Sequence, residues 1–305
     1  MNMYFIHTIA SISHQDSFQV PNVFERLEKL GDDSDIISPN YKEYVPPTAL
    51  RRLGPVLRMG LTASIECRNN VDADFDAISV GTALGCLKDT EKFLVTIHTT
   101  TSDFLSPTAF IQSTHNTIGG QISLGLKNHA YNMTHTQNNL SFEVALIDAI
   151  MCVNEGKQNV LVGAADEKID FLAQAQPDLI PDTHPLTSGA SFFVISPTKG
   201  STGIGVRDVH TNFNATNIAK DIQDFLSKNK LTTDDIDVIL SSNEQPFSDK
   251  QETLNYLDYS GMHYSAPAFA LHLAHDYLLS KGKKFALIVN DMCPGRLGLT
   301  LVEKQ

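Results

Sequence analysis

The sequence predicts an α/β fold of more than three layers, built from mixed, mostly parallel sheets and helices. Short apolar segments of strand length alternate with segments of helical apolar spacing in both halves of the 305 residues. Residues 140–154 and 266–279 form helices that are apolar on nearly all sides, and such helices need packing partners on both faces. These two observations together indicate an interior with covered sheets.

The first half begins with an apolar strand at residues 3–12. Residues 13–48 are polar and contain prolines, which is typical of a surface excursion. Residues 49–67 have helical apolar spacing, although Gly54-Pro55 argues against one unbroken helix. The remaining elements predicted here are strands at 75–81, 131–134, 160–165 and 191–195 and helices at 118–126 and 140–154.

The second half repeats this alternation of strands and helices. Its predicted strands are residues 203–209, 236–240, 285–289 and 297–302, and its predicted helices are residues 217–226 and 266–279.

The charge and the cysteines exclude several classes of protein. The net charge of −12 repels phosphate groups and anionic lipid, so we expect neither nucleic acid nor membrane as a partner. The four cysteines are widely spaced, and no two of them form a CxxC pair. We therefore expect reduced thiols and no metal site, and we expect no cofactor. The first residues have no basic segment followed by a long apolar one, and a cytoplasmic location is expected.

Several segments, read in chain order, resemble the β-ketoacyl-ACP synthase family, and the similarity spans nearly the whole chain. The resemblance lies in Ser106-Pro107, Asn116, residues 119–123 (GGQIS), 125–127 (GLK), 156–165, 188–191 (SGAS), Pro246, Asp249, 261–268 and 290–298. It implies a thiolase-like five-layer αβαβα fold of two related halves. We expect these halves at residues 1–200 and 201–305, forming one compact unit.

In that family, catalysis depends on a cysteine at the start of a buried helix and on two histidines. Counting along the matched segments places the cysteine position at Asn139, or at Gln137 when counted from the other side. The two histidine positions fall on Ser241 and Met262, with His263 one residue from the second. Because an amide cannot form a thioester, the resemblance predicts a relative without catalytic residues.

The family includes such relatives, the chain-length factors, which pair with an active synthase. The resemblance therefore implies a non-catalytic subunit of fatty-acid, polyketide or aryl-polyene biosynthesis, in a heterodimer with a synthase or in a homodimer. An acyl carrier protein would be an indirect partner. Residues 105–126 and 131–145 are expected near the interface, where Phe110 or Met133 could close the partner's acyl tunnel.

Two alternatives remain open at this point. His135, Ser141 and His263 could form a rebuilt site for an acyl hydrolase, a transferase or a malonyl decarboxylase. The polar residues at 135–141 could also be helix-capping residues only. A homodimeric module that binds acyl chains is a further possibility.

Overall fold

The computed structural model describes residues 2–31, 34–99, 107–172, 174, 184–243 and 251–305. Within these ranges the strands form one sheet in the order β3-β2-β4-β5-β1-β6-β10-β9-β7-β8. The strands are β1 (Tyr4–Ile12), β2 (Ala77–Gly81), β3 (Tyr131–His135), β4 (Val160–Asp166), β5 (Gly189–Ser196), β6 (Ile204–Asn212), β7 (Val238–Ser241), β8 (Glu252–Asn255), β9 (Phe285–Asn290) and β10 (Leu297–Lys304).

Helices cover both faces of this sheet. The α-helices are α1 (Pro47–Leu50), α2 (Pro55–Asn69), α3 (Leu87–Thr99), α4 (Pro107–Gln112), α5 (Thr117–Leu126), α6 (Ser141–Asn154), α8 (Ile218–Lys228), α9 (Leu257–Ser260) and α10 (Ala266–Ser280). The 3-10 helices are η1 (Val23–Arg26), η2 (Tyr41–Glu43), η3 (Asn138–Leu140) and η4 (Thr233–Asp235). No helix in the described ranges has the length and apolarity needed to cross a membrane.

The sheet consists of two halves with the same topology. In the first half the order is β3-β2-β4-β5-β1, and in the second half the corresponding strands follow as β8-β7-β9-β10-β6. In each half the first three strands of this order pair in parallel and the last three pair antiparallel. The chain therefore contains a structural repeat, with β1–β5 in one copy and β6–β10 in the other.

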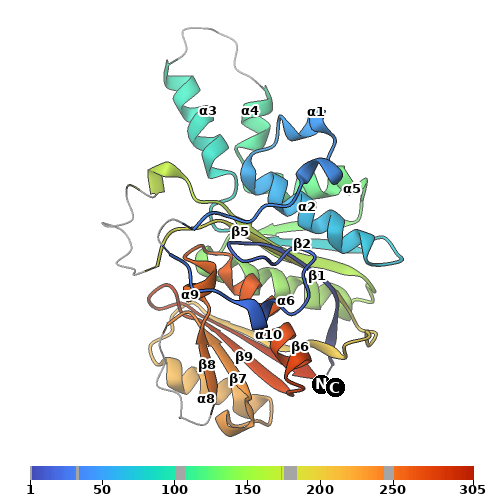
Figure 1. Cartoon of the computed structure of the whole chain (residues 1–305), viewed down its shortest axis with the longest axis vertical. Coiled ribbons are helices and arrows are strands. Elements are labelled where there is room, and N and C mark those ends of the chain that lie inside the picture. The colour runs from blue at the N-terminus through green and yellow to red at the C-terminus, as the bar shows by residue number, and fades with distance from the viewer. Residues whose placement is uncertain (1, 32–33, 100–106, 173, 175–183, 244–250) are drawn as a thin grey trace.

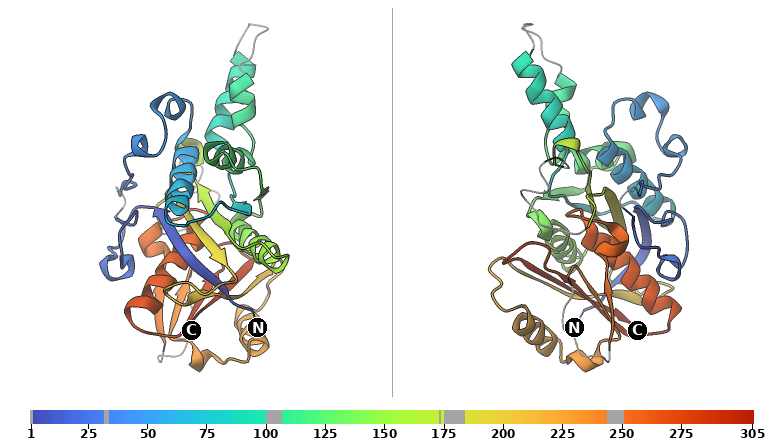
Figure 2. Two further views of the ribbon diagram at one scale, coloured as in Figure 1. Left: turned by 90° about the vertical axis from the view of Figure 1, so that its right-hand side faces the viewer. Right: turned by 60° about the vertical axis from the view of Figure 1, so that its left-hand side comes forward.

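Three hydrophobic cores separate the layers. The outer core of the first half packs α2 and α5 against one face of β2, β4 and β5. The central core contains α6 and α10 between the two halves of the sheet, and the third core places α8 against β7, β9 and β10. Successive residues of one strand point into different cores: in β4, Leu161 lies in the outer core and Val162 in the central core. The layers are visible from top to bottom in Figure 1, and Figure 2 shows them from two further sides. The predicted five-layer αβαβα arrangement is confirmed.

The two halves of the sheet meet at one short junction. Only Tyr4 with Val206 and Phe5 with Gly205 pair β1 with β6. A Cβ atom at position 205 would lie 2.5 Å from the Tyr4 carbonyl oxygen, so the close approach of these strands requires glycine.

The break expected at Gly54-Pro55 is present: it separates α1 from α2, because Pro55 has no N–H for a continuing helix. The structure differs from the prediction in two other respects. The sheet is mixed as predicted, but antiparallel pairs predominate among the described strands, since residues 291–296 are too few for a parallel crossover between β9 and β10. The sequence pattern also missed α3 and β8, which bury few or no side chains.

Candidate functional site

The turn between β3 and α6 contains Gln137 and Asn139, the two residues at which the resemblance predicts the family's nucleophile position. Asn138 has a φ of 59°, in the left-handed region. The Ser141 hydroxyl stabilises this turn, since it donates to the Asn138 carbonyl oxygen at 2.6 Å and accepts from the Gln137 backbone N–H at 2.8 Å. Ser141 is 1% exposed. Its hydroxyl is therefore part of the turn and is not presented to solvent.

Asn139 is fully buried and bonded to the end of β9. Its side-chain Nδ2 donates to Asn290 Oδ1 at 3.3 Å, and Asn290 Nδ2 donates to the Asn139 carbonyl oxygen at 2.7 Å. Asn290 Nδ2 also donates to Glu143 Oε1 at 2.8 Å. Burial raises the pKa of Glu143 to about 7. The result is a buried network of two amides and one carboxyl group below the turn.

Residues at the end of β7 extend this network. Ser241 is fully buried, and its carbonyl oxygen accepts from the Tyr256 backbone N–H at 3.0 Å. The Ser242 hydroxyl donates to Asp291 Oδ1 at 2.6 Å and accepts from the Asp291 backbone N–H at 2.9 Å. The β3–α6 turn and the end of β7 are thus both joined by hydrogen bonds to Asn290 and Asp291, where β9 ends and the β9–β10 loop begins.

The β9–β10 loop closes over the turn from outside. Arg296 Nη1 donates to the Gln137 carbonyl oxygen at 3.1 Å, and the half-buried Cys293 Sγ lies 3.9 Å from Asn138 Oδ1. Burial raises the pKa of the Cys293 thiol, and the Arg296 guanidinium opposes this shift only in part. Cys293 is therefore mainly a neutral thiol near neutral pH.

Met262 and His263 lie on the segment that leads into α10. Met262 is 2% exposed, and its backbone bonds to Pro185 and Thr187. His263 Nδ1 lies 2.9 Å from the Ser265 hydroxyl, and its ring packs against Gly189. Burial lowers the pKa of His263 to about 3, so this imidazole is neutral at physiological pH.

The side chains of the alternative polar site, His135, Ser141 and His263, have other partners in the structure. His135 Nε2 contacts Asp148 Oδ2 at 3.2 Å, where Tyr131 also donates to the other carboxylate oxygen. No hydrogen bond among the described residues joins Ser141 to His135 or to His263. Pro246 and Asp249, which supported the alignment of Ser241, lie outside the described residues.

Glu143, Asn290 and Tyr256 are buried polar residues of this site that the sequence analysis did not identify. The sequence could have indicated Glu143, because it is a charged residue in a helix whose other positions are nearly all apolar. Among the described residues, no group of three or more His, Cys, Asp or Glu side chains is placed to hold a metal ion.

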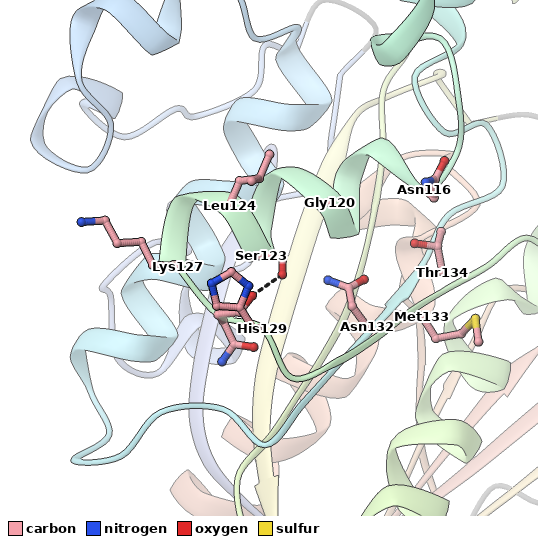
Figure 3. A pocket seen from close by; sticks show the side chains of 10 residues that line it. Asn116, Gly120, Ser123, Leu124, Lys127, His129, Asn132, Met133 and Thr134 are labelled. Carbon is pink, nitrogen blue, oxygen red and sulfur yellow. Dashed lines mark hydrogen bonds between the residues drawn. The ribbon is translucent and has the colours of Figure 1, made fainter.

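An apolar surface lies beside the turn. β3 is an edge strand that pairs only with β2 among the described strands. A groove of about 710 Å³ runs between β3 and α5, and Figure 3 shows Asn132 and Thr134 below α5, with Lys127 at the far end. Leu124 and Met133 line this groove and are 72% and 43% exposed. Further large apolar side chains exposed by more than a third lie on α4, β3 and α6: Phe110, Ile111, Tyr131 and Met151.

The sequence of this part of the chain identifies the family. Residues 32–198, more than half of the chain, match the N-terminal domain of β-ketoacyl synthases. The chain is a member of the β-ketoacyl synthase family. No curated protein matches the sequence.

Solved structures show the same thiolase-like fold as this β-ketoacyl synthase relative. The ishigamide ketosynthase/chain length factor matches with a TM-score of 0.79 and 13% identity over 99% of both chains. A ketosynthase in complex with its chain length factor from Xenorhabdus doucetiae matches with a TM-score of 0.64 and 13% identity over all of both chains. A type II polyketide synthase acyl-carrier protein in complex with its ketosynthase matches with a TM-score of 0.81 and 13% identity, also over all of both chains.

Proposed function

We propose that this chain is a non-catalytic ketosynthase-like subunit, similar to a chain length factor, that pairs with an active β-ketoacyl-ACP synthase. The chemistry of the β3–α6 turn supports this proposal most directly. Gln137, Asn138 and Asn139 offer amides where a thiolate would be required, and Ser141 is held by two hydrogen bonds within the turn. No side chain of this turn can accept an acyl group as a thioester.

The apolar surface beside the turn supports the pairing. One face of α6 is buried in the central core, but Val144, Ile147 and Ile150 are only partly buried and Met151 is 56% exposed. α6 also contacts the edge strand β3, whose outer edge pairs with no other strand among the described residues and is available to a strand of a partner. An apolar helix face and an open strand edge are together typical of an interface with another protein.

The similar solved structures include ketosynthases in complex with chain length factors. By analogy, the partner of this chain would be the synthase that carries out condensation. The acyl carrier protein would deliver the growing chain to that synthase, and Phe110 or Met133, which are 61% and 43% exposed, would close the end of its tunnel.

Co-expression with candidate synthases tests the proposal. We expect a one-to-one heterodimer by native mass spectrometry and products whose chain length changes when this subunit is omitted. A synthase with the same activity and the same products in its absence would contradict the proposal. So would a homodimer of this chain that excludes every synthase tested.

A further inference from the structure

A polar crevice of about 540 Å³ lies on a different part of the molecule from the β3–α6 turn. It is formed by β1, residues 17–21, the C-terminal end of α2 and α10. Its lining contains one acidic residue, Glu66, and two histidines, His7 and His272, but no lysine or arginine. The crevice therefore has an excess of negative charge.

Glu66 is a buried carboxylate without a cation. It is 9% exposed, its Oε2 accepts from the Tyr44 hydroxyl at 3.0 Å, and its Oε1 accepts from Asn70 Nδ2 at 2.9 Å. No ion pair between Glu66 and a Lys or Arg occurs in the parts of the chain that the structure describes. Buried carboxylates are usually paired with a positive charge, so the open side of Glu66 favours a cationic ligand.

Thr8 provides a second group for such a ligand. It is 9% exposed and lines the crevice, and its hydroxyl faces the buried Cys67 thiol but has no nitrogen or oxygen partner within the described residues. β1 shifts its register between Ile6 and Thr8, which is where the strand borders the crevice. An unsatisfied buried hydroxyl is costly, and a ligand that hydrogen-bonds to it would remove this cost.

His272 does not supply the missing positive charge. Its Nδ1 lies 2.9 Å from the Ser11 hydroxyl, and its Nε2 lies 3.6 Å from Asp276 Oδ2. Burial lowers the pKa of His272 to about 4, so the ring is neutral at pH 7. The buried Asp276 carboxylate behind it adds to the negative potential of this wall.

We propose that this crevice binds a small organic cation through a primary ammonium group, which donates hydrogen bonds to the Glu66 carboxylate and the Thr8 hydroxyl. An ammonium group carries three N–H donors, and the crevice offers acceptors while no lysine or arginine lines it. The net charge of −12 increases the local concentration of such ligands. The proposal is independent of the pairing with a synthase.

Calorimetric titration of the full chain with putrescine and spermidine, at constant ionic strength, tests this site. We expect saturable one-to-one binding. Tetramethylammonium, which has no N–H group, should bind at least tenfold more weakly. Glu66→Gln keeps the side-chain shape and an acceptor for Tyr44, and should weaken binding at least tenfold. Thr8→Val should weaken it several-fold.

Asp224→Asn, at an exposed position on α8, is the matched control for general charge attraction. It should leave the affinity unchanged. Three results would overturn the proposal: no saturable binding by the unmodified chain, equal losses in Glu66→Gln and Asp224→Asn, or potassium ions displacing putrescine at equal concentration. If Glu66→Gln lowers the thermal unfolding midpoint, its loss of binding is not informative and the test rests on Thr8→Val. Unchanged affinity of the Thr8→Val variant would then contradict the site.

Discussion

Buried polar atoms without partners concentrate around Asn139. Within the described residues, Asn139 Oδ1, Glu143 Oε2 and the Tyr256 hydroxyl have no hydrogen-bond partner, although all three side chains are 0% or 1% exposed. Such groups destabilise a protein by about 1–3 kcal/mol each. A folded core rarely keeps several such groups together, so this cluster marks the part of the core that is least satisfied in hydrogen bonds around Asn139.

Glu143 makes stability dependent on pH. Its pKa of about 7 in the folded chain lies above its ordinary value of 4.5, so the folded state favours the protonated carboxyl group. The stabilisation is complete below pH 4.5 and is lost as the pH rises through 7. Glu143→Gln should therefore raise the free energy of unfolding at pH 8 by on the order of 3 kcal/mol and leave it nearly unchanged at pH 4.5.

Urea unfolding of both proteins at several pH values between 4.5 and 8 measures this difference. Glu155→Gln, at the exposed end of α6, serves as the control and should follow the unmodified chain. Burial also raises the pKa of Glu167 to about 7 and that of Asp166 to about 6. Glu143→Gln should therefore reduce the dependence of the unfolding free energy on pH without abolishing it. Parallel curves for the two proteins would contradict this account of Glu143.

Among the elements, β3 and α6 form the surface that the proposed function depends on. Met133→Lys introduces a charge at the centre of the β3 edge and should weaken the heterodimer at least tenfold, because the ammonium group would be buried without a partner. The monomer should remain folded, since Met133 is 43% exposed. Phe213→Lys, at a position also 43% exposed but beyond β6, is the matched control. Equal affinities of both variants in analytical ultracentrifugation would place the interface elsewhere.

The junction between β1 and β6 is the weakest connection within the sheet. Gly205→Ala would place a methyl group 2.5 Å from the Tyr4 carbonyl oxygen and must displace one strand from the other. We expect a loss of about 2–3 kcal/mol in the free energy of unfolding, which overpacked positions commonly show. Gly200→Ala, whose Cβ would meet only the His7 ring at 3.5 Å, should cost much less. Denaturant unfolding of the two variants compares them directly.

At the scale of the whole molecule, the central core makes the two halves dependent on each other. It combines side chains of β4 and α6 with side chains of β9 and α10. A fragment of residues 1–200 would therefore expose the apolar surface that α10 covers. We expect this fragment alone to unfold without a cooperative transition, and to regain one when residues 201–305 are added. Cooperative unfolding of the isolated fragment would instead mean that the first half is a domain by itself.

The order of elements could be predicted from local patterns because each strand and helix that enters a core has the required period of apolar residues. α10 is the clearest case, since its residues from Ala266 to Leu278 are all buried. α3 was missed for the same physical reason: it has no buried side chains, so packing imposed no pattern on its sequence. β8 is short and lies at the edge of the sheet, where alternation is weak.

The candidate site could be predicted only in part. Family resemblance indicated the positions of Asn139 and Ser241, and the fold brings both segments to the β9–β10 loop. The hydrogen bonds of Ser141 and the contact of His135 with Asp148 could not be predicted. A polar side chain has several possible partners along the chain, and only the folded structure selects one of them.

The sequence by itself determined which chemical groups this protein lacks at the turn, and the alternation of strands and helices that builds its layers. Only the tertiary structure decided which polar groups meet, which apolar side chains stay exposed, and that Glu66 is buried without a cation. The physical reason is that residue type and periodicity are local properties. Burial, pairing and charge balance depend on segments that lie far apart along the chain and meet only after folding.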